Sequence, residues 1–599
     1  VLAEPITADI DVPGFDRASM DGYAVRARDT VDASEVDPAT LDLVGAVHAG
    51  EKPDVTVEPG TCVEISTGAV MPDRSNAVVV VEQTEEIEAD GEPRIEIRST
   101  VTPSENVMLA GADIAAGMRA LGPGSRLTPR EIGLLSAVGR ESVPVVDAPR
   151  VGIISTGEEL VRPGENLDSG RGEIYDVNSH TIAAGVEAAG GEPVVYPHAG
   201  DDFEAMERLL RQAADDCDLV VSSGSTSASA VDVIYRVIED RGELLVHGVA
   251  VKPGKPMLVG RLDRTDGGTS AYIGLPGYPV SALTIFRTFV APAIRNAAGR
   301  PEPAAASLSG EMATEARSEA GRLRLLSVGV FEDSEGRRLV YPVDKGSGAT
   351  MTLAEADGVV RIDPNTDYLE AGEQVTVELF SPDVRPPELL GIGEDDPALS
   401  ELLDQVGSTR YLPMGSREGL RRLRNGLPDF AVVAGPHDHP DGAVSVGAWH
   451  REWGLIVPDG NPDGIETLGD LVDRDVRFVN RETTSGLRTS LSNSLAELAD
   501  QRGVARHSLV EAIAGFESTV KAFESPARRV VEGRADVGLG LKTTADKHGL
   551  GFVSLGDQRV SLLVNPDRRE KPAVDRLERK LNTLAEHCAS LAGYRFAGE

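Results

Sequence analysis

The sequence contains few cysteines and no long apolar run, and these shortages exclude several classes of protein. Only three cysteines occur in 599 residues, at the distant positions Cys62, Cys217 and Cys588. They form neither an even disulfide set nor a metal-ligand spacing, so the sequence predicts a reducing, cytoplasmic environment. No apolar run approaches the roughly 20 residues needed to span a bilayer, and no secretory signal opens the chain. We therefore expect a soluble protein.

Positive charge is scarce as well. The chain has 59 Lys+Arg against 97 Asp+Glu, a formal net charge of -38, and only nine of its residues are lysines. So acidic a chain argues against general binding to nucleic acid or to anionic membranes. The acidic, arginine-dominated composition resembles that of cytosolic proteins from salt-accumulating, halophilic organisms. An anionic substrate would need a local positive pocket.

The length predicts several domains, because a single hydrophobic core stops growing at about 250–300 residues. Residues 148–298 alternate strand-like segments, such as 150–154 and 218–221, with helix-like segments at 178–189 and 231–240. This alternation predicts a parallel sheet with helices on its faces. The expected fold class is therefore a multidomain α/β protein.

Three motifs of this central segment stand in order where strands are expected to end. They are Ser-Thr-Gly-Glu-Glu-Leu at 155–160, Lys-Pro-Gly-Lys-Pro at 252–256 and Leu-Pro-Gly-Tyr-Pro-Val-Ser at 275–281. Open α/β sheets bind ligands at the carboxyl ends of their strands. In a chain with few lysines, Lys252 and Lys255 are candidates for contacts to phosphates. Pro276 and Pro279 fit a simple turn as well as a pocket wall.

Two further motifs occur near the start of the chain, an MDGYA-like segment at 12–24 and Ile-Ser-Thr-Gly-Ala at 65–69. With the three central motifs, they make the first two thirds of the chain resemble the molybdopterin molybdenumtransferase (MoeA/gephyrin) family. The resemblance implies an elongated protein. Its parts would be N-terminal and linker domains with a β-rich insertion at 1–147, a three-layer molybdopterin-binding domain at 148–298 and a small β-barrel at 299–381. We expect the family's N-terminal helix to be missing from this chain or processed away.

The resemblance also implies a reaction and a site. Molybdate would be joined to adenylylated molybdopterin with release of AMP, assisted by Mg²⁺, in a homodimer that could also work with a molybdopterin adenylyltransferase. Mg²⁺ binds one or two carboxylates together with substrate phosphates. The implied catalytic residues are Asp21, Asp113, Glu159 and Asp232, and the implied metal ligands are Glu159, Asp201 and Asp232. The implied substrate contacts are Thr67, Gly68, Ser155, Thr156, Gly157, Asp176, Asn178, Asp201, Ser223, Gly224, Ser227, Lys252, Lys255, Pro276, Gly277 and Pro279.

The chain departs from the family pattern at several positions, which keeps two alternatives open. Ser225 and Ser229 replace glycines that normally allow close backbone approach. Met108 and Ala112 stand where an arginine and a glutamate are usual, and Tyr278 replaces a common asparagine. One alternative is a molybdopterin adenylyltransferase, which the central domain also resembles. The other is a non-catalytic oxoanion sensor or reservoir.

The segment 388–599, after the stiff Arg385-Pro386-Pro387 linker, again alternates strand and helix. It resembles a two-lobed, periplasmic-binding-protein-like domain. Two clusters stand where helices are expected to begin, and such helix starts bind oxoanions but also use the same residues as ordinary caps. The candidate residues for molybdate or tungstate are Ser416, Thr483, Thr484, Ser485 and Arg488. The sequence does not distinguish the two oxoanions, and we interpret His437-Asp438-His439 as surface loop.

Overall fold

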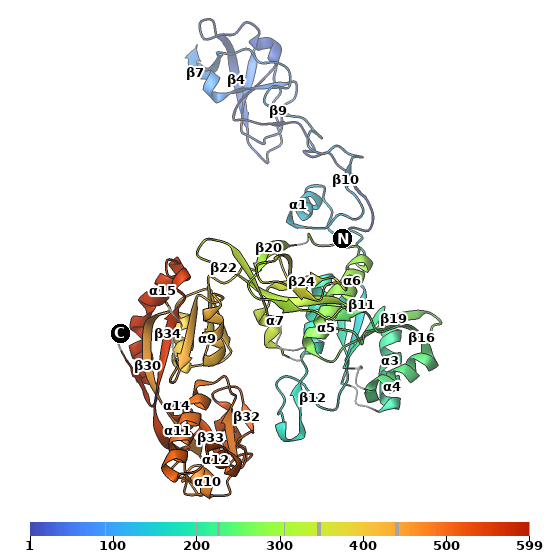
Figure 1. The fold of residues 1–599 in the computed structure, drawn as a ribbon. Helices are drawn as coiled ribbons and strands as arrows, with labels where there is room; N and C mark the ends of the chain where they lie inside the picture. Colours follow the sequence, from blue (N-terminus) through green and yellow to red (C-terminus); the bar gives the residue numbers. More distant parts are fainter. Residues whose placement is uncertain are drawn as a thin grey trace.

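The computed structural model describes residues 1–89, 91–198, 202–224, 228–304, 306–343, 349–437 and 442–597, without the side chains of residues 228–233. A β-rich domain, a small connecting domain, an α/β domain, a β-barrel and a two-lobed C-terminal domain make up the molecule (Figure 1). The β-rich domain stands apart at one end, whereas the barrel lies between the α/β and C-terminal domains. Among the described residues, no helix has both the length and the apolar character to cross a membrane.

The β-rich domain is a six-stranded sheet in the order β6-β3-β5-β4-β8-β7. Apolar clusters cover it on two sides, one around Tyr23 and Ile95 and one around Ala24 and Val63. A short pair, β2 (Arg17–Ala18) with β9 (Val107–Met108), adjoins it. The six strands are β3 (Gly22–Val25), β4 (Ala39–Val47), β5 (Thr61–Ile65), β6 (Ala77–Val80), β7 (Thr84–Ala89) and β8 (Glu92–Ile97).

The connecting domain pairs β1 (Ile6–Thr7) with β10 (Arg119–Leu121) and packs them near helix α1 (Pro129–Ala137). A capping box between Thr128 and Glu131 starts this helix, with proline at its first position. Leu2, Ile6 and Leu135 form its small core. The domain links the distant β-rich domain to the rest of the molecule (Figure 1).

The α/β domain has a six-stranded sheet in the order β14-β11-β15-β19-β18-β16. The first four strands run parallel, as the sequence predicts, whereas β18 and β16 add an antiparallel edge. Continuous apolar runs such as Val151–Ile154 are fully buried because helices cover both faces. The strands are β11 (Arg150–Ser155), β14 (Glu192–Val195), β15 (Leu219–Ser223), β16 (Gly242–His247), β18 (Leu258–Asp263) and β19 (Thr269–Leu275). The helices are α2 (Asn178–Ala189), α3 (Phe203–Asp216), α4 (Ala228–Arg241), α5 (Pro279–Ile285) and α6 (Ala291–Ala297), with the π-helical turn η4 (Phe286–Val290) before α6.

The barrel follows the order β22-β23-β20-β26-β24, and a further pairing of β22 with β24 closes it. Strand β17 (Val251–Lys252), which carries the start of the lysine motif, pairs with β22. The motif is thereby attached to the barrel as well as to the α/β domain. The barrel strands are β20 (Ser307–Met312), β22 (Leu323–Glu332), β23 (Arg338–Pro342), β24 (Gly358–Ile362) and β26 (Gln374–Leu379), and helix α7 (Met351–Glu355) precedes β24.

The C-terminal domain has two lobes joined by the 14-residue strands β30 (Val444–Val457) and β34 (Gly551–Val564), which pair along their length. The first lobe contains β27 (Leu389–Gly393), α8 (Pro397–Asp404), β28 (Thr409–Pro413), α9 (Ser416–Arg424), β29 (Phe430–Ala434), α15 (Pro572–Lys580), α16 (Leu584–Ser590) and β35 (Tyr594–Phe596). The second contains α10 (Asp470–Asp473), β31 (Phe478–Arg481), α11 (Gly486–Arg502), α12 (Arg506–Ala512), β32 (Thr519–Val520), α13 (Ser525–Val531), β33 (Val537–Leu541) and α14 (Lys542–Lys547).

The first lobe is docked on the barrel, which the linker sequence did not indicate. Phe331 and Tyr341 of the barrel share a buried core with Leu390 and Ile392 of β27. The guanidinium of Arg410 donates to both carboxylate oxygens of Asp357, at 2.7 and 2.8 Å. Lys571 Nζ donates to the carbonyl of Glu332 at 2.6 Å. These buried contacts fix the first lobe to the barrel and do not leave it on a free tether.

Candidate functional site

The motifs of the α/β domain meet where β11, β15 and β19 end. The N–H of Thr156 donates to the carbonyl of Ser223 at 2.8 Å, joining the ends of the first two strands. Asn178 Nδ2 donates to Ser223 Oγ and to the carbonyl of Gly277, both at 2.7 Å. The connections of β11 and β15 lead to opposite sides of the sheet at this point, and such switch points bind ligands.

Two glycines allow the loops of the site to touch. Gly224 has a φ of +95°, and a Cβ there would lie 2.3 Å from the carbonyl oxygen of Thr156. A Cβ on Gly277 would lie 3.2 Å from the Cα of Gly224. Only glycine fits at Gly224 without moving the chain. The loops that follow β11, β15 and β19 are therefore packed backbone against backbone, and Gly277 is exposed at their surface.

Asp176 lies buried two residues before the start of α2. Its carboxylate accepts hydrogen bonds from the N–H of Ser179 at 3.1 Å and faces His198 Nε2 at 3.0 Å. Burial alone would raise the pKa of Asp176, but the hydrogen bonds from Ser179 and His198, with the nearby Ser155 hydroxyl, outweigh it and lower the pKa below its usual range. Sequence analysis missed Ser179 and His198. Serine three residues after an aspartate at a helix start is a signal that could have revealed Ser179.

The charged residues of the motifs are accessible to solvent, at least in part. Lys252 Nζ donates to Glu319 of the barrel domain at 2.9 Å, while Lys255 is exposed. Glu159 is exposed beside Gly157. Because the ion pair of Lys252 is itself half exposed, an incoming anion can compete for this lysine with Glu319.

A second group of predicted residues lies in the β-rich domain. Asp21 accepts hydrogen bonds from the N–H of Thr67 at 2.6 Å and from its hydroxyl at 2.9 Å, and these bonds lower the pKa of the carboxyl. Gly68 follows with a φ of +82°. Asp113 lies apart on an exposed loop. Within one chain, therefore, these residues do not join the strand-end site of the α/β domain (Figure 1).

Several predicted residues fall outside the described structure. Asp201, Ser225 and Ser227 are not described, and neither are the side chains of Ser229 and Asp232. Among the described residues, no group of three or more His, Cys, Asp or Glu could hold a metal. Glu159 is described, and its exposed carboxylate is a hard oxygen ligand of the kind that Mg²⁺ accepts. The metal-ligand set stays a prediction.

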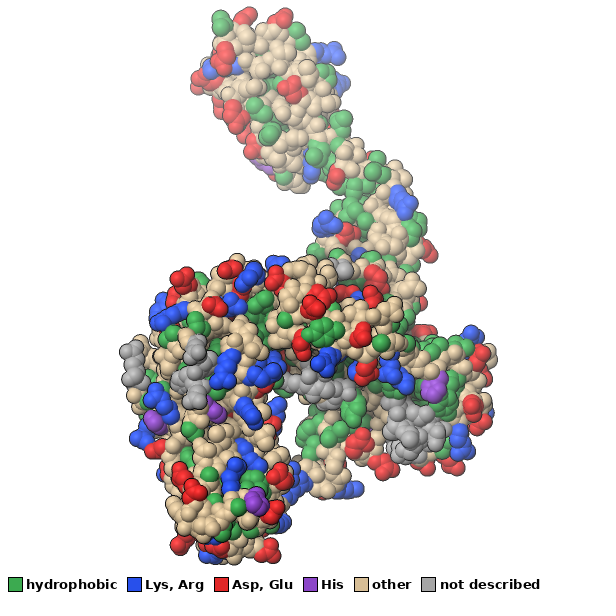
Figure 2. Space-filling model, in the orientation of Figure 1, with side chains coloured by type: hydrophobic (Ala, Val, Ile, Leu, Met, Phe, Trp, Pro, Cys, Tyr) green, Lys and Arg blue, Asp and Glu red, His purple; other side chains and the backbone are tan. Residues whose placement is uncertain are grey.

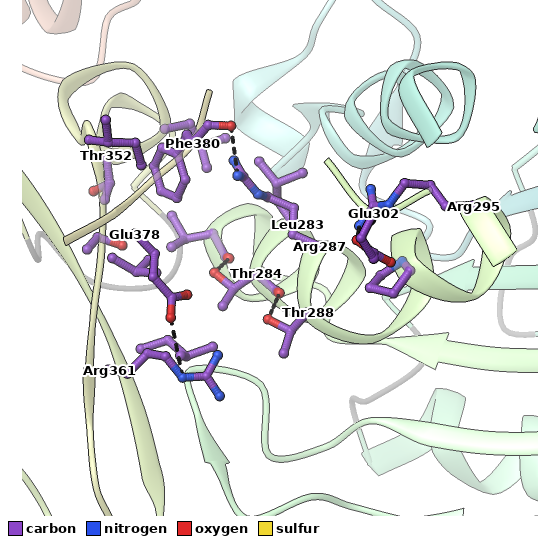
Figure 3. Close-up of a pocket in the computed structure, with 17 residues that line it drawn as sticks. Leu283, Thr284, Arg287, Thr288, Arg295, Glu302, Thr352, Arg361, Glu378 and Phe380 are labelled. Carbon is purple, nitrogen blue, oxygen red and sulfur yellow. Dashed lines mark hydrogen bonds and ion pairs between the residues drawn. The ribbon is translucent and has the colours of Figure 1, made fainter. Parts of the chain in front are cut away.

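A cavity of about 510 Å³ lies between helix α5 and the barrel, and Val280 is the one residue of the three motifs among those that line it (Figure 3). Arg287 donates to the carbonyl of Phe380 at 2.9 Å and lies over its ring. Arg361 is paired with Glu378, and Arg295 with Glu302. Because Arg287, Arg295 and Arg361 already have partners, none of these three described arginines is a free cation for an anionic substrate.

The helix starts of the C-terminal domain already hold an anion, the carboxylate of Glu394 at the end of β27. Its Oε2 accepts hydrogen bonds from the N–H of Ser416 at 3.1 Å, the hydroxyl of Ser416 at 2.6 Å and the N–H of Gly486 at 2.9 Å. Its Oε1 accepts a bond from the hydroxyl of Ser485 at 3.0 Å. The carboxylate thus bridges the starts of α9 and α11, one from each lobe.

A buried guanidinium balances this carboxylate. Arg451 is 0 % exposed and donates to Glu394, Asp396 and Gln558. Burial opposes ionisation of Glu394, but Arg451 and then Arg481 outweigh it, and the pKa of the carboxyl falls to about 2. Sequence analysis missed Glu394 and Arg451, because a lone Glu or Arg in so charged a chain carries no local signal.

The other residues predicted to bind an oxoanion have structural roles or face solvent. Thr484 Oγ1 donates to Glu482 at 2.9 Å, and Thr483 is exposed. Arg488 donates to the carbonyl of Phe516 at 3.0 Å and stacks on its ring. The helix-start donors expected for molybdate therefore serve Glu394 in this structure.

Comparisons with known proteins agree with this architecture. Family models match residues 1–139 (MoeA N-terminal region, domain I and II), 152–296 (probable molybdopterin binding domain), 309–380 (MoeA C-terminal region, domain IV) and 400–582 (PBP superfamily domain). "Molybdopterin molybdenumtransferase 2" of Mycobacterium tuberculosis is 35% identical over 385 residues, which cover 63% of this chain and 91% of the relative.

A second relative and a solved structure support the same family. The "Molybdopterin molybdenumtransferase" of a Nostoc species is 35% identical over 300 residues, covering 50% of this chain and 67% of the relative. A crystal structure of the molybdopterin biosynthesis MoeA protein from Pyrococcus horikosii superimposes with a TM-score of 0.55 and 40% identity, covering 64% of this chain and 91% of that one. The chain belongs to the molybdopterin molybdenumtransferase (MoeA) family and carries an additional C-terminal domain resembling periplasmic binding proteins.

Proposed function

We propose that the chain joins molybdate to adenylylated molybdopterin and releases AMP, as a step of molybdenum cofactor biosynthesis. The observation that carries the proposal is the strand-end site of the α/β domain, where the loops that follow β11, β15 and β19 contact one another. Backbone N–H groups at such loops bind phosphates. The exposed lysine motif supplies positive charge in a chain that is acidic elsewhere.

The proposed roles of the loops follow from their positions, whereas those of the lysines and of the metal ligands follow from the family resemblance. The loops at Ser155–Gly157, Ser223–Gly224 and Pro276–Pro279 would hold the pterin and its pyrophosphate, and Lys252 and Lys255 would bind phosphate or molybdate oxygens. Mg²⁺, held by Glu159 with Asp201 and Asp232, would neutralise phosphate charge when bound. Asp176 orients Ser179 and His198 at the rim. Asn178 keeps the two loops that it joins in register.

We propose that a second copy of the chain completes the site. Asp21, Thr67 and Gly68 lie in the β-rich domain, which stands apart from the strand-end site of its own chain (Figure 1). A homodimer that brings this domain over the α/β domain of its partner would unite the two groups. Asp113 would approach from the same side.

One experiment distinguishes the proposed insertion from the two alternative functions, adenylyl transfer and a non-catalytic oxoanion reservoir. The chain would be incubated with adenylylated molybdopterin, Mg²⁺ and molybdate or tungstate, and AMP would be measured. The insertion proposal expects AMP release that depends on the oxoanion. An adenylyltransferase would instead consume ATP and unmodified molybdopterin, and a non-catalytic oxoanion reservoir would release no AMP. The β-rich domain and the barrel favour insertion, because an adenylyltransferase needs only the α/β domain.

Replacing Asn178 by alanine tests the geometry of the site. The side chain joins the β15 loop to the β19 loop through two hydrogen bonds of 2.7 Å. Without it the loops are free to shift, and misplacement of about 1 Å can cost 10²-fold in rate. We expect kcat/KM for AMP release to fall about 10- to 100-fold. Asn425→Ala, at the end of α9 in the C-terminal domain, is the control and should leave the rate unchanged.

Oxoanion delivery by Ser416, Thr484 and Ser485 is not part of this proposal. The donors at the starts of α9 and α11 bind the Glu394 carboxylate, so a second anion there would meet a buried negative charge. Other residues that line the cavity between the two lobes are available to bind a ligand.

A further inference from the structure

A small cavity of about 190 Å³ lies between the two lobes of the C-terminal domain. At about 30 Å³ per water, this is space for about six water molecules. The cavity lies where the parallel strands β27, β28, β31 and β32 end, which is where α/β sheets bind ligands. The N–H of Arg417 donates to the carbonyl of Thr484 at 3.2 Å, so the lobes touch beside it.

Arg481 is the most informative residue in the wall of this cavity. It is 3 % exposed, and its Nη2 donates to the carbonyl of Lys521 at 2.7 Å. Its Nε and Nη1 are buried and have no hydrogen-bond acceptor among the described residues. A buried donor without an acceptor is costly, so such a group in a cavity wall indicates an acceptor from a ligand.

Asp395, in the wall of the same cavity, supplies a hydrogen-bond acceptor, whereas Arg481 supplies donors. It lies directly after Glu394, and its carboxylate takes no hydrogen bond from the other described residues. Burial raises its pKa, while nearby Arg481 acts in the opposite direction. The cavity therefore presents an unpaired acceptor close to an unpaired donor.

The charge of the lining decides between classes of ligand. Glu394, Asp395 and Glu482 face Arg481 and Lys521, a formal charge of -1. A molybdate, tungstate or sulfate dianion has no proton to donate to Asp395. The other two acidic residues of the lining, Glu394 and Glu482, would also repel such a dianion. A ligand with an anionic group beside a hydrogen-bond donor satisfies both Arg481 and Asp395.

We propose that this cleft binds a small zwitterion of the α-amino acid class, with its carboxylate on Arg481 and its ammonium on Asp395, and that Glu394 permanently fills the place of an oxoanion. The Glu394 carboxylate already takes four hydrogen bonds from the helix starts besides the guanidinium of Arg451. Displacing it would leave Arg451 with a poorer set of acceptors. The C-terminal domain would then sense a metabolite and not supply the oxoanion.

The test uses the full chain and its two tryptophans. Both, Trp449 and Trp453, lie buried in β30, so tryptophan fluorescence follows the C-terminal domain alone. Each L-amino acid, and separately molybdate, tungstate and sulfate, would be added at millimolar concentration during thermal unfolding. We expect at least one amino acid to raise the midpoint and the three dianions to leave it unchanged. Calorimetry would then measure the dissociation constant of that amino acid.

Two substitutions locate the binding. Arg481→Gln and Asp395→Asn should each weaken the amino acid about tenfold or more, the effect of losing a hydrogen bond to a charged group. Arg506→Gln, an exposed arginine of α12, should not. Stabilisation by molybdate or tungstate instead, no response to any amino acid, or binding that survives both substitutions would overturn the proposal. AMP release is a separate readout, so none of these outcomes affects the transferase proposal.

Discussion

Replacing Glu394 by alanine should destabilise the C-terminal domain by about 3–5 kcal/mol, the cost of removing one partner from a buried ion pair. The substitution leaves Arg451 with Asp396 and Gln558 as its acceptors. It also leaves the N–H groups of Ser416 and Gly486 without the carboxylate that they bind. The free energy of unfolding would be measured by denaturant titration, followed by tryptophan fluorescence. Glu466→Ala, on an exposed loop, is the matched control and should change it by less than about 0.5 kcal/mol.

The same variant tests whether Glu394 stands in for an oxoanion. With the carboxylate gone, the starts of α9 and α11 become an empty anion site, and sulfate or molybdate should stabilise the variant but not the unaltered chain. In the native chain the pKa of Glu394 is about 2, below its ordinary value of 4.5. Its stabilisation is therefore complete above about pH 4.5 and is lost as the pH falls toward 2. An alanine variant as stable as the native chain would refute the assignment.

Replacing both Lys252 and Lys255 by methionine should lower kcat/KM for AMP release by about 10²- to 10⁴-fold. A hydrogen bond to a charged group contributes about 1.5–3 kcal/mol, and about 1.4 kcal/mol corresponds to tenfold. The two lysines belong to the motif that we propose to bind phosphate or molybdate, in a chain with only nine lysines, so few other cations of this kind are available. The kinetics would be measured at several concentrations of adenylylated molybdopterin and of molybdate.

The fold should survive this double substitution. Lys255 is exposed, and the pair between Lys252 and Glu319 is half exposed, so neither lysine contributes much to stability. Lys580→Met, at the exposed end of α15, serves as the control and should leave kcat/KM unchanged. If the double variant turned over at the native rate, the lysine motif would have no part in the site.

Local sequence patterns predicted most of the helices and strands of the α/β domain. Helix α2 begins and ends at the predicted Asn178 and Ala189, and strand β11 (Arg150–Ser155) covers the predicted strand at 150–154. Such elements follow from apolar periodicity and turn residues, which are local. The meeting of the motifs followed from the rule that parallel strands place their carboxyl ends together.

The features that sequence reasoning missed depend on contacts between distant residues. Glu394 meets Ser485 across 91 positions and Arg451 across 57. The pairs of Arg410 with Asp357 and of Lys571 with the Glu332 carbonyl, which dock the C-terminal domain on the barrel, are equally remote in the chain. A proline-rich segment indicates a boundary, but it does not tell whether the domains on either side share a core.

The distribution of surface charge also depends on how distant parts of the chain come together. The net charge of -38 is a sum over the whole chain and does not tell where the Lys and Arg side chains gather on the surface. Figure 2 shows Lys and Arg side chains concentrated on this face where the C-terminal domain and the barrel approach the α/β domain, while Asp and Glu spread over the rest. Composition alone averages over such an arrangement.

We expect molybdenum insertion by this chain to be coupled to cleavage of the adenylyl bond. The most direct measurement is the amount of molybdenum retained by the pterin for each AMP released, in one reaction with adenylylated molybdopterin, molybdate and Mg²⁺. We expect equal amounts of the two products, and neither product when molybdate is left out. AMP release that continues unchanged without molybdate, or molybdenum binding without AMP release, would show that insertion and cleavage are not coupled.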